Sequence, residues 1–394
     1  MKKSLFALAA VGAFASGAQA QSSVTVYGAL DGGYNSSNTV QKSATAGAAD
    51  TKAITRGFSG ENIVSSRLGV RGSEDLGGGR AAIFNFELGI AQGTGNVVTN
   101  STVSTAGVAL TSAQQQQQTL VRTSMVGISD KALGTVSVGR RLTGIHGVVF
   151  GDYGLAGNNM SGYLTGDDQA AGTAASVNMR VHFNATRMSN GIYYESPTIS
   201  GASIRIDYSN DGTTTAAAGT TGSASNLGIS GRYVLGGLTV KAATHDVKTT
   251  AGTVSADATN GNAAQTAAAT ISTRINAASI GYSTGPIAAE LIYAANEAKQ
   301  SNAQLSKVTA TMAVVQYKIG AATPFVRYGI GNTEQAIGVN KADTTGYQIG
   351  SSYAMSKRTS LYAVYGSQNS KVKTTNVGAD HTKTEIGLGL FHTF

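Results

Sequence analysis

The chain has 394 residues, of which 51 are Gly, 3 are Pro and none is Cys or Trp, and its formal net charge is +8. Charged residues make up 13%, about half of the roughly 25% typical of soluble domains. The mean hydropathy is -0.04, which is far from that of a helical membrane protein with apolar spans of about 20 residues. A disordered chain would carry more charge. The lack of Cys excludes disulfides, a thiolate nucleophile and Cys-based metal sites.

The first twenty residues have the pattern of a secretory signal peptide. Lys2 and Lys3 precede an apolar run from Leu5 to Ala15, and 18–20 has the sequence Ala-Gln-Ala that signal peptidase cuts. The apolar run is too short for a membrane span. We therefore predict a signal peptide at 1–20, with cleavage before Gln21, and a single barrel domain at 21–394.

Most of the remaining chain consists of runs of about ten residues with apolar side chains at alternate positions. In residues 82–90 every even-numbered side chain is apolar, whereas Asn85 and Glu87 lie on the opposite face. Residues 325–330 and 382–394 repeat this alternation. A period of two is typical of β-strands. A helical period of 3.6 residues is not sustained in any segment, so we expect almost no helix.

The connections between these runs alternate between short and long. Seven are short and rich in turn-forming residues, as in Glu74–Gly79 and Leu235–Gly237. Eight are long and rich in Gly, Ser, Thr, Ala and Asn, and they lie at about 35–63, 91–118, 142–179, 211–224, 249–273, 298–305, 334–341 and 370–381. Fifteen connections predict sixteen antiparallel strands. An even strand number with short turns at one end is typical of an outer-membrane barrel.

The polar face of the predicted strands carries more charge than a packed core tolerates. Its charged residues include Arg67, Arg71, Glu87, Arg122, Arg327, Lys383 and Glu385. We therefore expect an all-β, sixteen-stranded antiparallel transmembrane β-barrel in which this face lines water and the apolar face meets lipid. Sixteen strands leave an aqueous lumen. Aromatic residues near strand ends are candidates for the interfacial girdles, namely Tyr27, Tyr34, Tyr208, Tyr282, Tyr317, Tyr353 and Phe394.

Several segments resemble the trimeric general porins of Gram-negative outer membranes. The resemblance is carried by Ser23–Asp31, Ser66–Gly79, Val126–Ile128, Gly134–Arg140, Asn190–Pro197 and Ser356–Tyr362, together with His392 and the terminal Phe394. The segments occur in consistent order along the chain after the signal peptide. The resemblance implies short periplasmic turns, long external loops and a third long loop, at about 142–179, folded into the lumen.

The same resemblance implies a function and a set of site residues. The function is passive diffusion of small hydrophilic solutes and ions through a homotrimer that contacts outer-membrane lipid and lipopolysaccharide. Arg67, Arg122 and Arg187 match a ladder of arginines on the barrel wall. The opposing acidic loop supplies Asp152, Asp167 and Asp168, and Phe394 matches the assembly signal of the last strand. Opposed rows of charge create a field across the constriction, and arginine rings favour anions.

Other functions receive less support from the residues. The loop Gly77–Gly79 lacks the Lys-Ser/Thr of a phosphate-binding loop, and Ala218 stands where a calcium loop starting at Asp207 needs Glu. The five His residues show no metal-ligand spacing, and the basic residues form no dense nucleic-acid patch. We expect no cofactor and no metal. Two alternatives remain open, an adhesin or receptor-binding barrel and an outer-membrane hydrolase with a Ser nucleophile.

Overall fold

The computed structural model describes most of the chain after the predicted signal peptide. The described residues are 22–43, 47–91, 96–97, 121–155, 158–164, 187–216, 220–251, 269–300, 303–335, 340–373 and 380–394. The predicted signal peptide at 1–20 lies outside them, and its assignment stays a prediction. No helix among the described residues has the length and apolar character that a membrane crossing requires.

The described residues are almost entirely β-strand, with one short helix, α3 (His146–Val149). The strands are β1 Ser23–Gln41, β2 Thr51–Ser59, β3 Arg67–Gly77, β4 Arg80–Ala91, β5 Asn96–Val97, β6 Val121–Asp130, β7 Gly134–Leu142, β8 Arg187–Glu195, β9 Ala202–Ala216, β10 Thr220–Leu235, β11 Leu238–Ala251, β12 Ala269–Thr284, β13 Ile287–Gln300, β14 Ala303–Tyr317, β15 Ala322–Gln335, β16 Asn340–Ala354, β17 Thr359–Val372 and β18 His381–Thr393.

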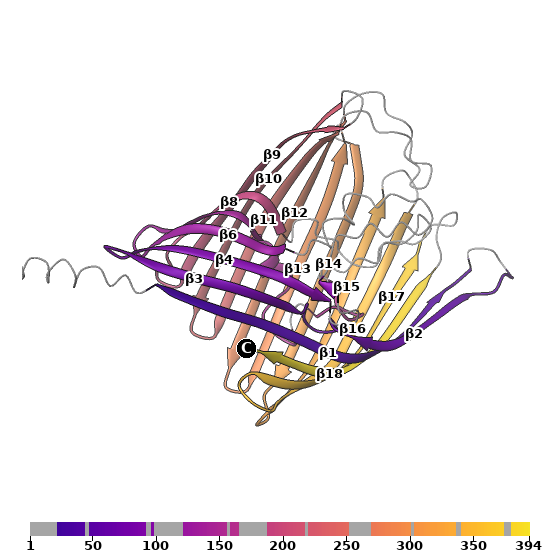
Figure 1. Cartoon of the computed structure of the whole chain (residues 1–394). Helices are drawn as coiled ribbons and strands as arrows, with labels where there is room; N and C mark the ends of the chain where they lie inside the picture. Colours follow the sequence, from indigo (N-terminus) through magenta and orange to yellow (C-terminus); the bar gives the residue numbers. More distant parts are fainter. Residues whose placement is uncertain are drawn as a thin grey trace, which may run out of the picture.

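These strands form a closed antiparallel barrel of sixteen strands, which confirms the predicted fold class (Figure 1). Residues 33–41 of β1 pair with β2 and residues 23–29 pair with β3, so β2 and β3 are two halves of one barrel strand. The two-residue β5 pairs with the end of β4, which also pairs with β6. The barrel closes where β1 pairs with β18 from Ala29 opposite Thr393 to Gln41 opposite His381. Closure pairs the backbone that a lipid-facing edge would leave unsatisfied.

The alternation in the sequence corresponds to the two faces of the barrel wall. On β15, Val326, Tyr328 and Ile330 are each at least half exposed on the outside, whereas Arg327 on the inner face is only 1% exposed. The candidate girdle residues are exposed on the outside, except Tyr27. Its hydroxyl donates to Asn85 and Glu87 inside the barrel. The girdle assignment of Tyr27 was therefore wrong, because polar strand neighbours hold its hydroxyl on the inner face.

Several strands extend further than the sequence predicted. β1 and β2 occupy most of the predicted connection 35–63, and β9 and β10 occupy most of 211–224. Likewise, in the predicted connections 298–305 and 334–341, only residues 301–302 and 336–339 lie between the flanking strands. In these segments both faces carry Ser, Thr, Ala and Asn, so hydrophobicity does not alternate. Backbone pairing continues without the pattern by which strands are recognised.

A bulge of seven residues, 60–66, interrupts the second barrel strand. Ala29 of β1 lies opposite Arg67, whereas Gly33 lies opposite Ser59. Three residues of β1 therefore face seven residues of the neighbouring strand. Asp31, fully buried, accepts hydrogen bonds from the Ile63 and Val64 amides at 2.6 and 3.0 Å. We call residues 60–66 the bulge segment, and these bonds hold it on the inner side of the wall.

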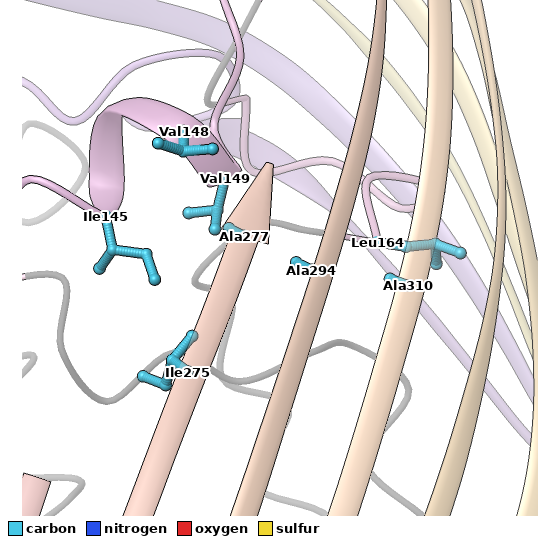
Figure 2. Packing of buried hydrophobic residues seen from close by; sticks show 8 residues of the cluster. All are labelled: Ile145, Val148, Val149, Leu164, Ile275, Ala277, Ala294 and Ala310. Atoms are coloured by element: carbon cyan, nitrogen blue, oxygen red, sulfur yellow. The ribbon is translucent and has the colours of Figure 1, made fainter. Parts of the chain in front are cut away.

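The described residues between β7 and β8, 143–155 and 158–164, also lie inside the barrel. We call these residues the inner loop. Ile145, Val148 and Val149, at and next to α3, pack against Ile275, Ala277 and Ala294 of the wall (Figure 2). This apolar cluster fixes the start of the inner loop on β12 and β13, because burying these side chains removes apolar surface from water.

Candidate functional site: the barrel interior

The inner loop is fastened to one side of the barrel by hydrogen bonds to successive strands. The Gly144 amide donates to Asp207 of β9 at 2.6 Å and the Asp152 amide donates to Glu290 of β13 at 2.6 Å. The Gly154 amide reaches Gln316 of β14 at 2.8 Å, and the Ser161 amide reaches Glu385 of β18 at 2.5 Å. Wall side chains thus satisfy loop amides that would otherwise be buried without partners.

Arg327 of β15 is the largest fully buried side chain among the described residues. Its guanidinium donates to Gln348 at 2.7 Å and to the carbonyls of Tyr153 and Gly154 at 2.9 and 3.0 Å. The guanidinium also lies 4.2 Å from the ring centroid of Tyr163. The sequence predicted that Arg327 and Glu385 would line water, and this prediction was wrong because the inner loop covers both of them.

A second ionic contact holds Asp152. Lys241 of β11 lies 3.1 Å from Asp152 and 3.1 Å from Glu290, and it donates to the Gly147 carbonyl at 3.0 Å. Asp152 therefore pairs with the wall that carries the inner loop. Asp167 and Asp168 lie outside the described residues. The prediction that these three carboxylates form the acidic side of a constriction stays a prediction.

The opposite side of the interior carries a group of arginines that we call the arginine wall. Its members are Arg67 on β3, Arg122 on β6, Arg140 and Arg141 on β7, Arg187 on β8 and Arg205 on β9. These strands come earlier in the chain than those that bind the inner loop, except β9, which carries both Arg205 and Asp207. A register shift between Gly139 and Arg141, with φ of 125° at Gly139, bends β7 between its two neighbouring arginines.

Two of the predicted ladder residues meet at one carboxylate. Glu87 of β4 lies 2.7 Å from Nε of Arg122 and 3.7 Å from Nε of Arg67, and it accepts a hydrogen bond from Tyr27 at 3.1 Å. The sequence placed Glu87 on the polar face but did not single it out. Its position opposite Gly69 and Thr123 on the flanking strands puts it between the two arginines. The pairing register between strands would have identified Glu87, but the sequence of a single strand does not reveal that register.

The other arginines differ in their partners. Arg141 and Arg205 pair with Glu195 at 3.0 and 3.2 Å, and Arg205 also pairs with Asp207 at 2.6 Å. Arg140 donates to neutral oxygens, the Val121 carbonyl at 2.9 Å and the Ser189 hydroxyl at 2.6 Å. Arg140 therefore keeps its positive charge without a neutralising carboxylate among these contacts.

The charge of Arg187 acts on His146 of the inner loop. Enclosure by protein lowers the pKa of His146 to about 3, and the charges of Arg187, Arg122 and Arg205 lower it in the same direction. The His146 ring stacks on Phe150, with centroids 4.2 Å apart. A neutral imidazole thus lies where the inner loop approaches the arginine wall.

Phe394 lies at the seam that closes the barrel. Its amide donates to the Gly28 carbonyl at 3.2 Å, and the Gly28 amide donates back to its carbonyl at 3.1 Å. A Cβ atom at Gly28 would overlap the Phe394 ring. The glycine therefore makes room for the terminal aromatic residue, whose role as an assembly signal stays a prediction.

A closed barrel of sixteen antiparallel strands, apolar outside and charged inside, has the architecture of the outer-membrane β-barrel proteins. The family model described as Gram-negative porin matches residues 7–373. The chain therefore belongs to the Gram-negative porin family.

Individual relatives agree with this family. An outer membrane porin protein of Bordetella pertussis is 32% identical over 213 residues, which are 53% of this chain and 48% of the relative. The matched region thus spans about half the length of that curated relative. The anion-selective porin from Comamonas acidovorans has a TM-score of 0.63 at 21% identity, covering 95% of this chain and 100% of that chain. The trimer form of OmpT from Vibrio cholerae has a TM-score of 0.59 at 16% identity, covering 95% and 99%.

Proposed function

We propose that the protein is an outer-membrane porin that lets small hydrophilic solutes and ions diffuse passively through its lumen. The observation that carries the proposal is the division of the interior into two sides. The inner loop is bonded to the wall from β9 to β18, whereas the arginine wall on β3 to β9 carries solvated charge. A sixteen-stranded barrel is wide enough for an aqueous channel between such surfaces.

The channel favours anions over cations. Arg140 has only neutral partners among its hydrogen bonds, and Arg67 and Arg122 share the single carboxylate of Glu87. The arginine wall therefore presents excess positive charge to a passing ion, and basic rings favour anions. The relative from Comamonas acidovorans is itself described as anion-selective, which agrees with this charge balance.

Export and assembly complete the proposal. Residues 1–20 direct the chain out of the cytoplasm and are removed, and the barrel then works as a homotrimer in the outer membrane. The trimeric form of the OmpT relative supports this oligomeric state. None of the three relatives named above is described as an adhesin or an enzyme. Diffusion therefore has the support that adhesion and hydrolysis lack.

Single-channel recording in planar lipid bilayers tests the proposal. The wild-type protein should give stepwise, ohmic conductance, and its reversal potential in a KCl gradient should indicate anion preference. Arg67→Ala and Arg122→Ala should each lower the anion-to-cation permeability ratio by about two- to fivefold, because a unit charge a few ångströms from an ion contributes an energy of order RT in water.

A charge-matched control comes from the exposed turn between β16 and β17. Arg358→Ala removes one positive charge there and should leave the permeability ratio unchanged. A wild-type protein that inserts and stays silent would contradict the channel. Unchanged ratios in both Arg67→Ala and Arg122→Ala would contradict the selectivity role of the arginine wall.

A further inference from the structure

The bulge segment carries a carboxylate, Glu61, that the assignments above do not use. The segment is fixed at both ends of its excursion. The Ser66 hydroxyl donates to the Gly60 carbonyl at 2.8 Å, and the Asp31 amide donates to the same hydroxyl oxygen at 3.0 Å. The Ser66 carbonyl accepts from the Ile90 amide at 2.8 Å. The backbone on either side of Glu61 thus has a defined path inside the barrel.

The bulge segment and the inner loop meet at Glu61. The Asn159 side chain donates to the Glu61 carbonyl at 2.8 Å, and the Asn159 amide donates to the Asn62 carbonyl at 3.0 Å. Next to this contact, Ile63 packs with Met160 of the inner loop in one buried apolar cluster. The residues around Glu61 are therefore held tightly, whereas the Glu61 side chain itself is exposed.

The charge of Glu61 acts on the arginine wall. Burial of the surrounding chain raises the pKa of Glu61, while Arg122 acts on the carboxyl in the opposite direction and Asp31 adds to the rise. Arg67, Arg122 and Glu87 together carry two positive charges and one negative charge. A carboxylate at Glu61 brings this group to neutrality, so that its net charge depends on one exposed residue.

We propose that Glu61 is a specificity-determining residue, an acidic group that the bulge segment holds inside the barrel, between the inner loop and the start of the strand that carries Arg67, and that it limits the preference of the channel for anions. The inference rests on the proposed diffusion function and refines it. Asp31 is the positioning residue for this arrangement, because its carboxylate holds the amides of Ile63 and Val64 and accepts from the Tyr362 hydroxyl at 2.6 Å.

Reversal potentials in a KCl gradient test the proposal on a graded series at position 61. Glu61→Asp should keep the wild-type permeability ratio. Glu61→Gln should raise the anion-to-cation ratio by about two- to fivefold, and Glu61→Lys should raise it further, because the series changes the local charge in steps of one unit. A merely structural disturbance would not follow the order of the charges.

Glu334→Gln is the matched control. Glu334 is paired with Lys341 at 3.1 Å near the end of β15, on the face opposite to buried Thr333. This control should leave the ratio at the wild-type value. The role of Glu61 would be overturned if wild type, Glu61→Gln and Glu61→Lys had equal ratios and normal conductance. If Arg122→Ala still shifted the ratio in that case, the proposed diffusion function would stand. A wild-type protein without conductance would overturn the diffusion function as well.

Discussion

The two sides of the barrel interior use similar residues in opposite ways. On the loop-covered side, Arg327, Lys241 and Glu290 are 1%, 5% and 3% exposed and hold backbone groups of the inner loop. On the arginine wall, the Arg67 side chain is 30% exposed and the Arg122 side chain 17% exposed. Charge on the covered side is structural, because a buried ion that loses its partner destabilises the fold strongly. Charge on the arginine wall faces the water through which a solute passes.

The largest effect is expected from Arg327→Ala. The substitution leaves the carbonyls of Tyr153 and Gly154 without their donor, and it removes the contact with the Tyr163 ring. The Gln348 oxygen loses one of two donors and keeps Asn158. Each buried carbonyl left without its donor costs about 1–3 kcal/mol, and the cavity left by the large side chain adds to this cost. The inner loop should leave the wall, so single-channel recordings should show a broader distribution of conductance and more open-channel noise than wild type.

Arg358→Ala again serves as the control for this variant, since it removes the same charged side chain from an exposed turn. Sharp, wild-type conductance steps in Arg327→Ala would show that the inner loop does not depend on this anchor. That result would contradict the interpretation that buried charge on the loop-covered side has a structural role.

A somewhat smaller effect is expected at the Lys241 contact. Lys241→Met leaves the carboxylate of Glu290 buried without its counter-ion, which costs about 3–5 kcal/mol. Asp152 also loses its partner, but its side chain is partly exposed and can move into water, which reduces the total cost. The double variant Lys241→Met/Glu290→Gln removes both charges and should recover most of the loss. The midpoint temperature of heat denaturation in detergent measures both. A double variant as unstable as the single one would contradict the interpretation as an uncompensated charge.

The smallest effect concerns His146 and pH. Its pKa is about 3 in the folded protein, against an ordinary value of 6.5. The unfolded chain therefore binds the proton first. The stability contributed by neutral His146 is complete above about pH 6.5 and is lost as the pH falls towards 3, by at most about 1.4 kcal/mol per pH unit.

Denaturation midpoints measured from pH 7.5 down to pH 5 test this expectation. His146→Gln keeps a neutral polar side chain, so its midpoint should fall less than that of wild type over the same range. Identical pH dependence in the two proteins would contradict the assignment of a neutral, enclosed imidazole facing the arginine wall.

The barrel could be predicted from the sequence because the pattern that indicates each strand is local. Each strand alternates within about ten residues, and the alternation placed Arg67 and Arg122 correctly on the inner face, next to the exposed Leu68. The girdle assignment of Tyr27 was wrong although the same alternation, with Val24 and Val26 exposed on the outside, puts it on the inner face, where its partners Asn85 and Glu87 come from another strand. Register between strands is a property of pairs of segments, which a single strand does not reveal.

The burial of charge on the loop-covered side could not be predicted, because it also depends on contacts between segments that are far apart in the chain. Arg327 follows the alternation correctly, yet its burial depends on Tyr153, which is 174 positions away in the chain. The bulge segment looked like part of a long external connection, and its inward path depends on Asp31, 32 positions before Ile63. Polar residues alone do not distinguish a loop that enters the lumen from one that leaves it.

The seam between β1 and β18 has a consequence for how the barrel assembles. It joins Gly28 to Phe394, and beside it Tyr362 bonds to Asp31 across 331 positions of the chain. The wall becomes a ring only after these distant segments meet, so assembly depends on contacts that are slow to form. Until then β1 and the last paired strand present open edges, which attract other strands. Closure is therefore the step at which productive assembly competes with aggregation, and the residues at the seam decide that competition.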